Sequence, residues 1–126
     1  MTARTPEDVD RVFAEALNAG NLDALVALYE PQATLRPMPD KTVTGHAAIR
    51  EALAGFLAGK PRMKLTARVL GQTDDLALVA AQWQLDMTGP DGKPAQMTGQ
   101  SMEVVRRQSD GSWKFVIDNP FGLAAV

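Results

Sequence analysis

The sequence predicts an α+β domain in which three N-terminal helices cover one face of a largely antiparallel sheet. Up to about residue 58 the apolar residues recur every three or four positions, whereas from residue 62 onwards they alternate with polar residues. The chain has 126 residues, which corresponds to a single domain, 1–126, with room for a core and one internal cavity. Helices first and long strands afterwards are typical of the α+β class.

The first two helices are predicted from their caps and their apolar spacing. Thr5 is a suitable N-cap and Pro6 a suitable first helical residue. Gly20 can end this helix, Asn21 can cap the next, and Pro31 stops the second one. The apolar face of the first helix consists of Val9, Val12, Phe13, Ala16 and Leu17.

A short strand is expected over 33–36, followed by a loop that holds Pro37, Pro39 and Asp40. A third helix is expected over 46–58, because its apolar residues share one face. These residues are Ile49, Leu53, Phe56 and Leu57.

The second half of the chain predicts four strands that are joined by tight turns. Alternation of apolar and polar residues gives a strand over 62–69, and turn residues separate the later strands, which are expected over 76–88, 96–108 and 112–119. Successive strands with short connections form an antiparallel meander.

Composition excludes several classes of function. Thirteen basic and fifteen acidic residues give a net charge of −2, which argues against a general binder of nucleic acid or of anionic membranes. The absence of cysteine excludes disulfides and thiolate chemistry, and a single histidine excludes a site built on several imidazoles. We therefore expect no metal and no cofactor. With no segment of signal-peptide or membrane-span character, a cytoplasmic protein is expected.

Four segments, in the same order along the chain, resemble a known superfamily. They are 19–29 (AGNLDALVALY), 29–35 (YEPQATL), 45–50 (GHAAIR) and 110–114 (DGSWK). Together they are similar to the nuclear transport factor 2-like superfamily, in its SnoaL-like and ketosteroid-isomerase-like branch. The resemblance implies a strongly curved sheet wrapped round the helices as a cone, with an internal, mostly apolar pocket for a small molecule. It also implies a homodimer formed through the outer sheet face.

Carrying over the steroid-isomerase site removes most of its catalytic groups. The position of the catalytic base falls on Pro37 and that of the tyrosine donor on Phe13, neither of which can exchange a proton. The position of the second, acidic donor falls on Glu103, which is an acid. Classical steroid isomerisation is therefore not expected, although Asp40 could offer a displaced base.

The closing strand suggests a different acid–base pair. The resemblance turns Val116 and Asp118 towards the cavity and leaves Trp113, Phe115 and Ile117 on the outer face. Asp118 and Glu103 would then be two carboxyl groups in one apolar cavity, where burial and mutual repulsion raise the pKa of at least one of them. Such a pair can supply a general acid and a general base.

Simple alternation along the same strand predicts the opposite arrangement. It places Trp113, Phe115 and Ile117 in the core and Asp118 in solvent. Asp118 and Asn119 would then bond the backbone at the strand end. Glu103 would likewise be an exposed partner of a neighbouring arginine.

Further candidates for substrate contact each have a structural alternative. Trp83 could line the cavity or fill the core, and His46, in the first turn of a helix, is expected at the surface. The candidate substrate-binding residues are Trp83, Phe13, Phe56, Val116 and Asn119.

The functional hypothesis is a small-molecule pocket protein that acts as a cofactor-free isomerase, cyclase or dehydratase, with Asp118 and Glu103 as catalytic residues. The alternative is a non-catalytic ligand-binding or dimeric interaction module. In a purely structural member of the family the pocket would be filled from within. Methionine suits this filling, and the candidates are Met63, Met87, Met97 and Met102.

Overall fold

The computed structural model describes residues 2–125 and contains three α-helices, six strands and one short 3₁₀ helix. The helices are α1 (Asp8–Asn18), α2 (Leu22–Ala27) and α3 (His46–Leu57), and the 3₁₀ helix is η1 (Gly122–Ala125). The strands are β1 (Tyr29–Met38), β2 (Lys41–Thr44), β3 (Arg62–Gln72), β4 (Leu76–Thr88), β5 (Pro94–Arg107) and β6 (Trp113–Asn119).

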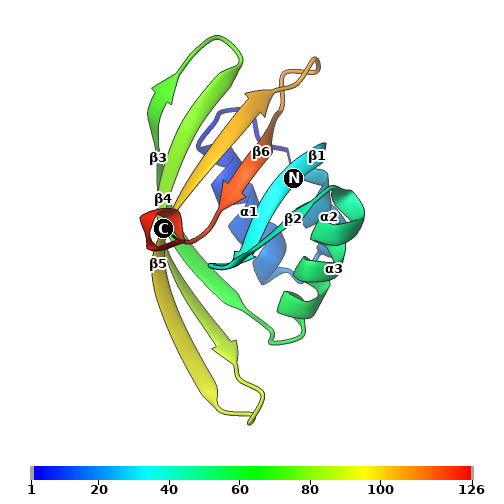
Figure 1. The fold of residues 1–126 in the computed structure, drawn as a ribbon, viewed down its shortest axis with the longest axis vertical. Helices are drawn as coiled ribbons and strands as arrows, with labels where there is room; N and C mark the ends of the chain where they lie inside the picture. The colour runs from blue at the N-terminus through cyan, green and yellow to red at the C-terminus, as the bar shows by residue number, and fades with distance from the viewer. Residues whose placement is uncertain (1, 126) are drawn as a thin grey trace.

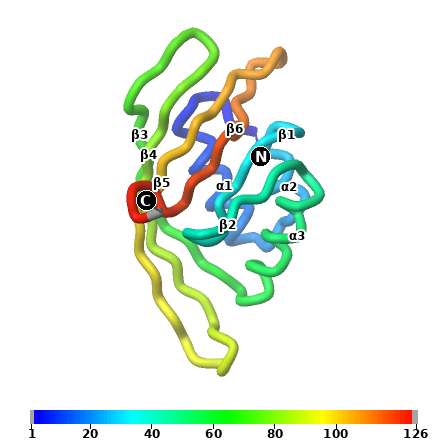
Figure 2. The backbone as a smooth tube through the Cα atoms, in the orientation of Figure 1, coloured from blue at the N-terminus to red at the C-terminus, as the bar shows by residue number. Residues whose placement is uncertain are grey.

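All six strands belong to one sheet with the order β2-β1-β6-β5-β4-β3. The pairing of β1 with β6 is parallel and every other pairing is antiparallel. The three helices lie on one side of this curved sheet, and the β3–β4 and β4–β5 hairpins extend in opposite directions (Figure 1). The tube view shows the same curvature along β3, β4 and β5 (Figure 2). The predicted α+β class and cone-shaped sheet are confirmed.

The core fills the space between α1 and the inner face of the sheet. Helix α1 buries the apolar face predicted for it, apart from Phe13, which is half-buried. Each fully buried side chain of this size contributes about 1.5–3 kcal/mol. Alternate residues of β4, among them Ala77, Val79 and Leu85, close the core from the sheet side.

Residues 27–44 differ from the prediction. Helix α2 ends at Ala27, and β1 begins at Tyr29 and continues through Pro31 and Pro37 to Met38. The strand tolerates Pro31 because its register with β6 shifts between Tyr29 and Thr34, where regular ladder bonds are interrupted. The expected loop contains a turn at 39–40 and then a strand that the sequence did not predict, β2.

A bulge in β6 settles the conflict between the two interpretations of this strand. Val105 pairs with Phe115 whereas Val104 pairs with Ile117, so Val116 is an extra residue on β6. Trp113 and Phe115 are buried, and their expected outward orientation is wrong. After the bulge the alternation is inverted.

Candidate functional site

Four buried polar side chains gather between α1 and the inner face of the sheet. Asp10 comes from α1, Tyr29 from the start of β1, Glu103 from β5 and Asp118 from β6. Glu103 and Asp118 are direct cross-strand partners, an arrangement that places side chains about 5 Å apart on one face. The bulge at Val116 is what turns Asp118 to the same side as the core residue Phe115. We call these four residues the acid cluster.

Asp118 is held by a tyrosine hydroxyl. The Tyr29 hydroxyl donates to Asp118 Oδ2 over 2.5 Å, and Asp118 is only 6% exposed. Burial raises the pKa of Asp118 to about 7; the hydrogen bond from Tyr29 opposes this shift and the nearby Asp10 charge adds to it. Burial and the neighbouring carboxyls raise the pKa of Tyr29, with Asp118 the largest contributor among them. Tyr29 therefore remains a donor at neutral pH.

Glu103 and Asp10 form the other half of the acid cluster. Glu103 is 1% exposed, and neither of its carboxyl oxygens has a hydrogen-bond partner; the same holds for Asp10 Oδ2. Burial, followed by the neighbouring Asp10, raises the pKa of Glu103 far above its usual range. Burial also raises the pKa of Asp10. Glu103 is therefore protonated at neutral pH.

Packing and a backbone contact fix the position of Tyr29. Its ring centroid lies 4.9 Å from that of Phe115, and the Phe13 ring packs edge-on against the same phenyl group at 6.0 Å. His46 Nε2 lies 2.7 Å from the backbone oxygen of Tyr29. Because a carbonyl oxygen only accepts, the imidazole donates from Nε2. The half-buried His46 therefore joins the start of α3 to β1.

Trp83 and Asn119 direct their polar groups to the C-terminal segment and not to the acid cluster. The indole N–H of Trp83 donates to the backbone oxygen of Pro120 over 2.8 Å. Its ring lies over Gly99, where a Cβ atom would come within 2.4 Å of the indole. Asn119 bonds the backbone of Gly122 and Phe121, as the strand-end interpretation predicted for this type of residue.

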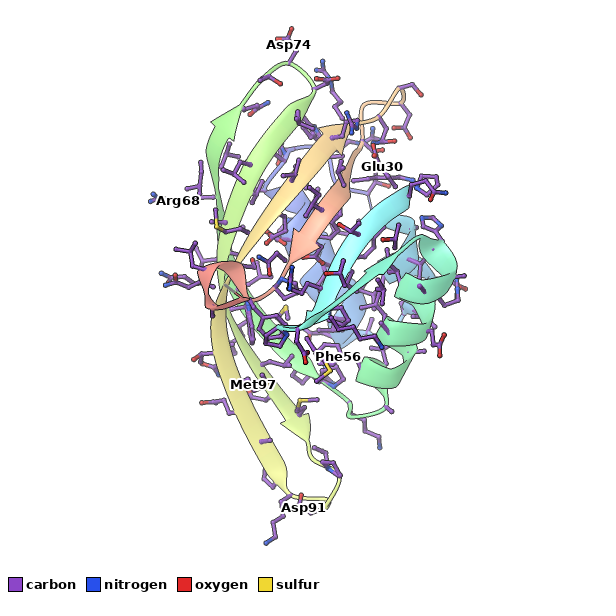
Figure 3. All side chains as sticks on the ribbon, in the orientation of Figure 1. Glu30, Phe56, Arg68, Asp74, Asp91 and Met97 are labelled. Carbon is purple, nitrogen blue, oxygen red and sulfur yellow. The ribbon has the colours of Figure 1, made fainter. Side chains whose placement is uncertain are left out.

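The remaining predicted contact residues are partly buried. Phe13 and Phe56 pack against the core, and Phe56 lies between α3 and the long strands in Figure 3. Val116 is half-buried in the bulge. Neither position considered for a base belongs to the acid cluster. Pro37 is a half-buried residue near the end of β1, and Asp40 is exposed in the turn before β2.

Asp10 and Tyr29 were not predicted as site residues. Asp10 carries a signal that could have revealed it, since it lies three residues before Phe13 and seven before Leu17, on the apolar face of its helix. An acid in that position is a candidate for a buried partner. Tyr29 carried no such signal, because it was assigned to a helix end.

Two hollows within residues 2–125 lie away from the acid cluster. One, of ≈ 540 Å³, is lined by β3, β4 and β5, with the exposed Lys64, Gln82 and Gln100 among its residues. The other, of ≈ 230 Å³, includes Leu78 and Val104 on the outer face. Side chains close the interior around Glu103 and Asp118.

The four methionines proposed to fill the pocket are divided between the core and the surface. Met63 and Met87 pack against the core. Met97 is exposed on the β4–β5 hairpin (Figure 3), and Met102 is half-buried on the alternate face of β5.

Two other kinds of feature are absent from residues 2–125. Within this range no three His, Cys, Asp or Glu side chains are arranged to hold a metal ion. None of the helices described there has the length and apolar character needed to span a membrane.

The chain belongs to the SnoaL-like domain family, which matches residues 9–116. Its fold is similar to that of a nuclear transport factor 2-like superfamily protein from Salmonella enterica subsp. enterica serovar Typhimurium str. LT2, with a TM-score of 0.80 and 15% identity over 92% of this chain and 87% of that one. It is also similar to that of a ketosteroid isomerase-like protein from Erwinia carotovora atroseptica SCRI1043, with a TM-score of 0.78 and 18% identity over 89% of this chain and 88% of that one.

A third similar structure is a proposed scytalone dehydratase from Novosphingobium aromaticivorans DSM 12444. It gives a TM-score of 0.79 and 18% identity over 89% of this chain and 77% of that one. At these identities the likeness establishes the fold, and the chemistry must be argued from this chain's own residues.

Proposed function

We propose that the protein is a cofactor-free isomerase, cyclase or dehydratase that acts on an apolar small molecule, with Asp118 as the base and Glu103 as the proton donor. The observation that supports this is the pairing of two buried carboxyl groups across neighbouring strands, one of them bonded to a tyrosine hydroxyl. Two acids in different environments can perform opposite proton transfers at one pH.

Asp118 and Glu103 differ in pKa, as a reaction with one base and one proton donor requires. Asp118 has its pKa near 7, so a substantial fraction is ionised at neutral pH and can accept a proton. Glu103 retains its proton and can donate a hydrogen bond. In the proposed step Asp118 removes a proton from a carbon next to a carbonyl group, and Glu103 stabilises the negative charge that develops on the carbonyl oxygen.

Substrate entry requires the interior to open beside Asp118. The two acids are almost fully buried, and apolar side chains, among them Phe115 and Leu35, surround Asp118 on β6 and β1. A substrate that enters must displace some of these contacts, and the surroundings favour an apolar one. Exclusion of water from the closed site would strengthen the hydrogen bond from Glu103 to the reacting oxygen.

Asp118→Asn tests the proposed base directly. Exchange of the α-protons of steroid-like and polyketide-like ketones for deuterium, followed by proton NMR, reports the first step without knowledge of the natural product. We expect exchange with the unmodified protein and a loss of about 100-fold or more in the variant. Asp74→Asn, at the exposed tip of the β3–β4 hairpin (Figure 3), is the matched control. Full activity of Asp118→Asn would exclude this assignment.

We also propose a homodimer formed through the outer sheet face. A dimeric interaction module is the alternative function if the acid cluster is not catalytic. Leu78, Val104 and Ile117 are successive cross-strand partners on β4, β5 and β6. Leu78 is 37% and Ile117 48% exposed, so the row leaves apolar surface in water. A second copy that presents the same row would bury both in an isologous interface.

Sedimentation of Ile117→Lys tests the proposed dimer. We expect the unmodified protein to sediment as a dimer and the variant as a monomer, because lysine cannot be buried unpaired at the centre of the interface. Leu123→Lys, an exposed leucine in η1, should leave the dimer intact. Identical behaviour of both variants would contradict the proposed interface.

A further inference from the structure

The proposed reaction does not use Asp10, although this residue is as deeply buried as the base. Asp10 is 6% exposed on α1, next to Glu103 of β5, and its Oδ2 atom has no hydrogen-bond partner. Both carboxyl oxygens of the neighbouring Glu103 also lack a hydrogen-bond partner. Buried polar atoms are almost always partnered in proteins, so three orphaned oxygens in one place require an explanation.

We infer that Asp10 and Glu103 form a carboxyl–carboxylate pair that shares one proton, and that Asp10 is thereby a positioning residue for the donor and the base of the site. One proton between the two groups gives a donor where both groups were acceptors, and it satisfies one oxygen on each side. The proton stays on the pair, and no group is oxidised or reduced. The role in catalysis rests on the proposed function, whereas the shared proton itself does not.

The surroundings of the pair supply no alternative counter-charge. The titratable groups that face it are Asp118 from β6 and Tyr29 from β1, and the buried Ser101 of β5 favours the ionised form of Glu103. Within residues 2–125, no lysine, arginine or histidine is among the groups that shift the pKa values of these carboxyls. Two or three bare carboxylates in an apolar interior would each lose several kcal/mol of hydration. Retaining a proton is the least costly way to avoid that loss.

The pair has a consequence for Asp118. The charge of Asp10 raises the pKa of Asp118 and works against the hydrogen bond from Tyr29. It also raises the pKa of Glu103. Asp10 therefore keeps a proton on Glu103 while the site is empty and tunes the base towards neutrality without touching the substrate. When a substrate binds, Glu103 must turn this O–H group from Asp10 to the substrate oxygen.

Carbon-detected NMR of the side-chain carboxyl groups, over about pH 4 to pH 9, tests the inference on the whole protein. The Glu103 and Asp10 signals are assigned from Glu103→Gln and Asp10→Asn. We expect the unmodified pair to retain one proton at neutral pH. In Asp10→Asn we expect the midpoint of Asp118 to fall by about half a pH unit or more, because the neighbouring charge is gone. Asp74→Asn should leave the Asp118 midpoint unchanged.

Two results would overturn the inference: full ionisation of both Asp10 and Glu103 at neutral pH in the unmodified protein, or an Asp118 midpoint that Asp10→Asn does not move. The first result needs no variant to fold other than the two used for assignment. A merely structural role of Asp10 would change stability but not the Asp118 midpoint. In the exchange assay the acidic limb of the pH profile should shift downwards with that midpoint.

The two proposals fail separately. If the shared proton is present but no ketone is turned over, the proposed function fails and the pair stands. If Asp118→Asn abolishes exchange but both Asp10 and Glu103 are ionised at neutral pH, the pair fails and the base assignment stands.

Discussion

Two adjacent rows of cross-strand neighbours run across β4, β5 and β6 with opposite and unexpected polarity. The inner row, Val79–Glu103–Asp118, puts two carboxyl groups under the helices, whereas the outer row, Leu78–Val104–Ile117, leaves apolar side chains in water. A sheet with one solvated face normally has the reverse arrangement. The inversion costs stability on both faces, and such local departures from consistency are expected at functional surfaces.

The comparison separates two kinds of burial within one strand. Before the bulge in β6, Phe115 fills the core by apolar contact alone, and after it Asp118 is accommodated by a hydrogen bond and by a raised pKa. Apolar burial is insensitive to pH, while burial of an acid depends on it. Substitutions at these positions should therefore differ both in size and in pH dependence.

The largest effect is expected from Phe115→Ala. This side chain is 1% exposed and contacts the rings of Phe13 and Tyr29, so its loss leaves a cavity and should cost about 3–5 kcal/mol of unfolding free energy. Ile117→Ala, two residues away on the outer face, should cost well under about 1 kcal/mol at concentrations where the protein is monomeric. Urea unfolding measures both. Equal costs would show that the bulge does not separate the two faces as described.

The stability of the protein should fall as pH rises from mildly acidic to neutral. Asp118 has a folded-state pKa of about 7, above its ordinary value of 3.8, so the folded state binds more protons than the unfolded state between these values. The stabilisation is complete below about pH 4 and is lost as pH rises through about 7. The expected slope is about 1.4 kcal/mol per pH unit for each extra proton held.

Glu103 and Asp10 have raised pKa values and act in the same direction. Unfolding in urea at several pH values measures the slope, and Asp118→Asn should reduce it by the contribution of one proton between pH 4 and pH 7. Stability that increases over this range would contradict the buried, protonated cluster.

A smaller effect is expected from Tyr29→Phe. The variant keeps the ring contact with Phe115 but removes the hydroxyl that donates to Asp118. The pKa of Asp118 should rise further, because that hydrogen bond favours the carboxylate. At a pH above that pKa, the variant should lose about 1–3 kcal/mol of unfolding free energy. At mildly acidic pH it should lose less, because a neutral carboxyl group accepts a weaker hydrogen bond than a carboxylate.

A double-mutant cycle with Asp118→Asn isolates this interaction. The coupling between the two positions should be largest at alkaline pH, where Asp118 is ionised. A coupling that is the same at all pH values would mean that the hydroxyl does not stabilise the carboxylate.

Much of the fold follows from local sequence patterns. The apolar spacing of 9–17 and 46–58 predicted α1 and α3, and strict alternation with turn residues predicted β3 to β6 to within a few residues. Family resemblance added the curved sheet, which local periodicity does not contain. The errors lie at 27–44, where Pro31 predicts a helix end and Pro37 a loop, although both lie in β1. A strand tolerates proline where its register is irregular, and the register of β1 depends on β6, which is more than 80 residues away along the chain.

The candidate site was predicted only in part. Glu103 and Asp118 were identified from the family pattern, although alternation along β6 contradicted the inward orientation of Asp118. Asp10 was passed over on an otherwise apolar helix face, and Tyr29 was assigned to a helix end. The four residues come from four different elements. No local sequence pattern therefore predicts that Asp10 and Tyr29 lie close to the two predicted acids.

The identity of the elements and the choice of acidic side chains are properties of the sequence, since helical and strand periods and carboxyl chemistry are local. Which face Asp118 occupies was settled by one extra residue in β6, and a bulge is defined only by the strand that pairs with it. The pKa values of the acid cluster likewise arise from assembly. Desolvation and the mutual approach of Asp10, Glu103 and Asp118 exist only once α1 covers the sheet, because both depend on distances through space and not along the chain.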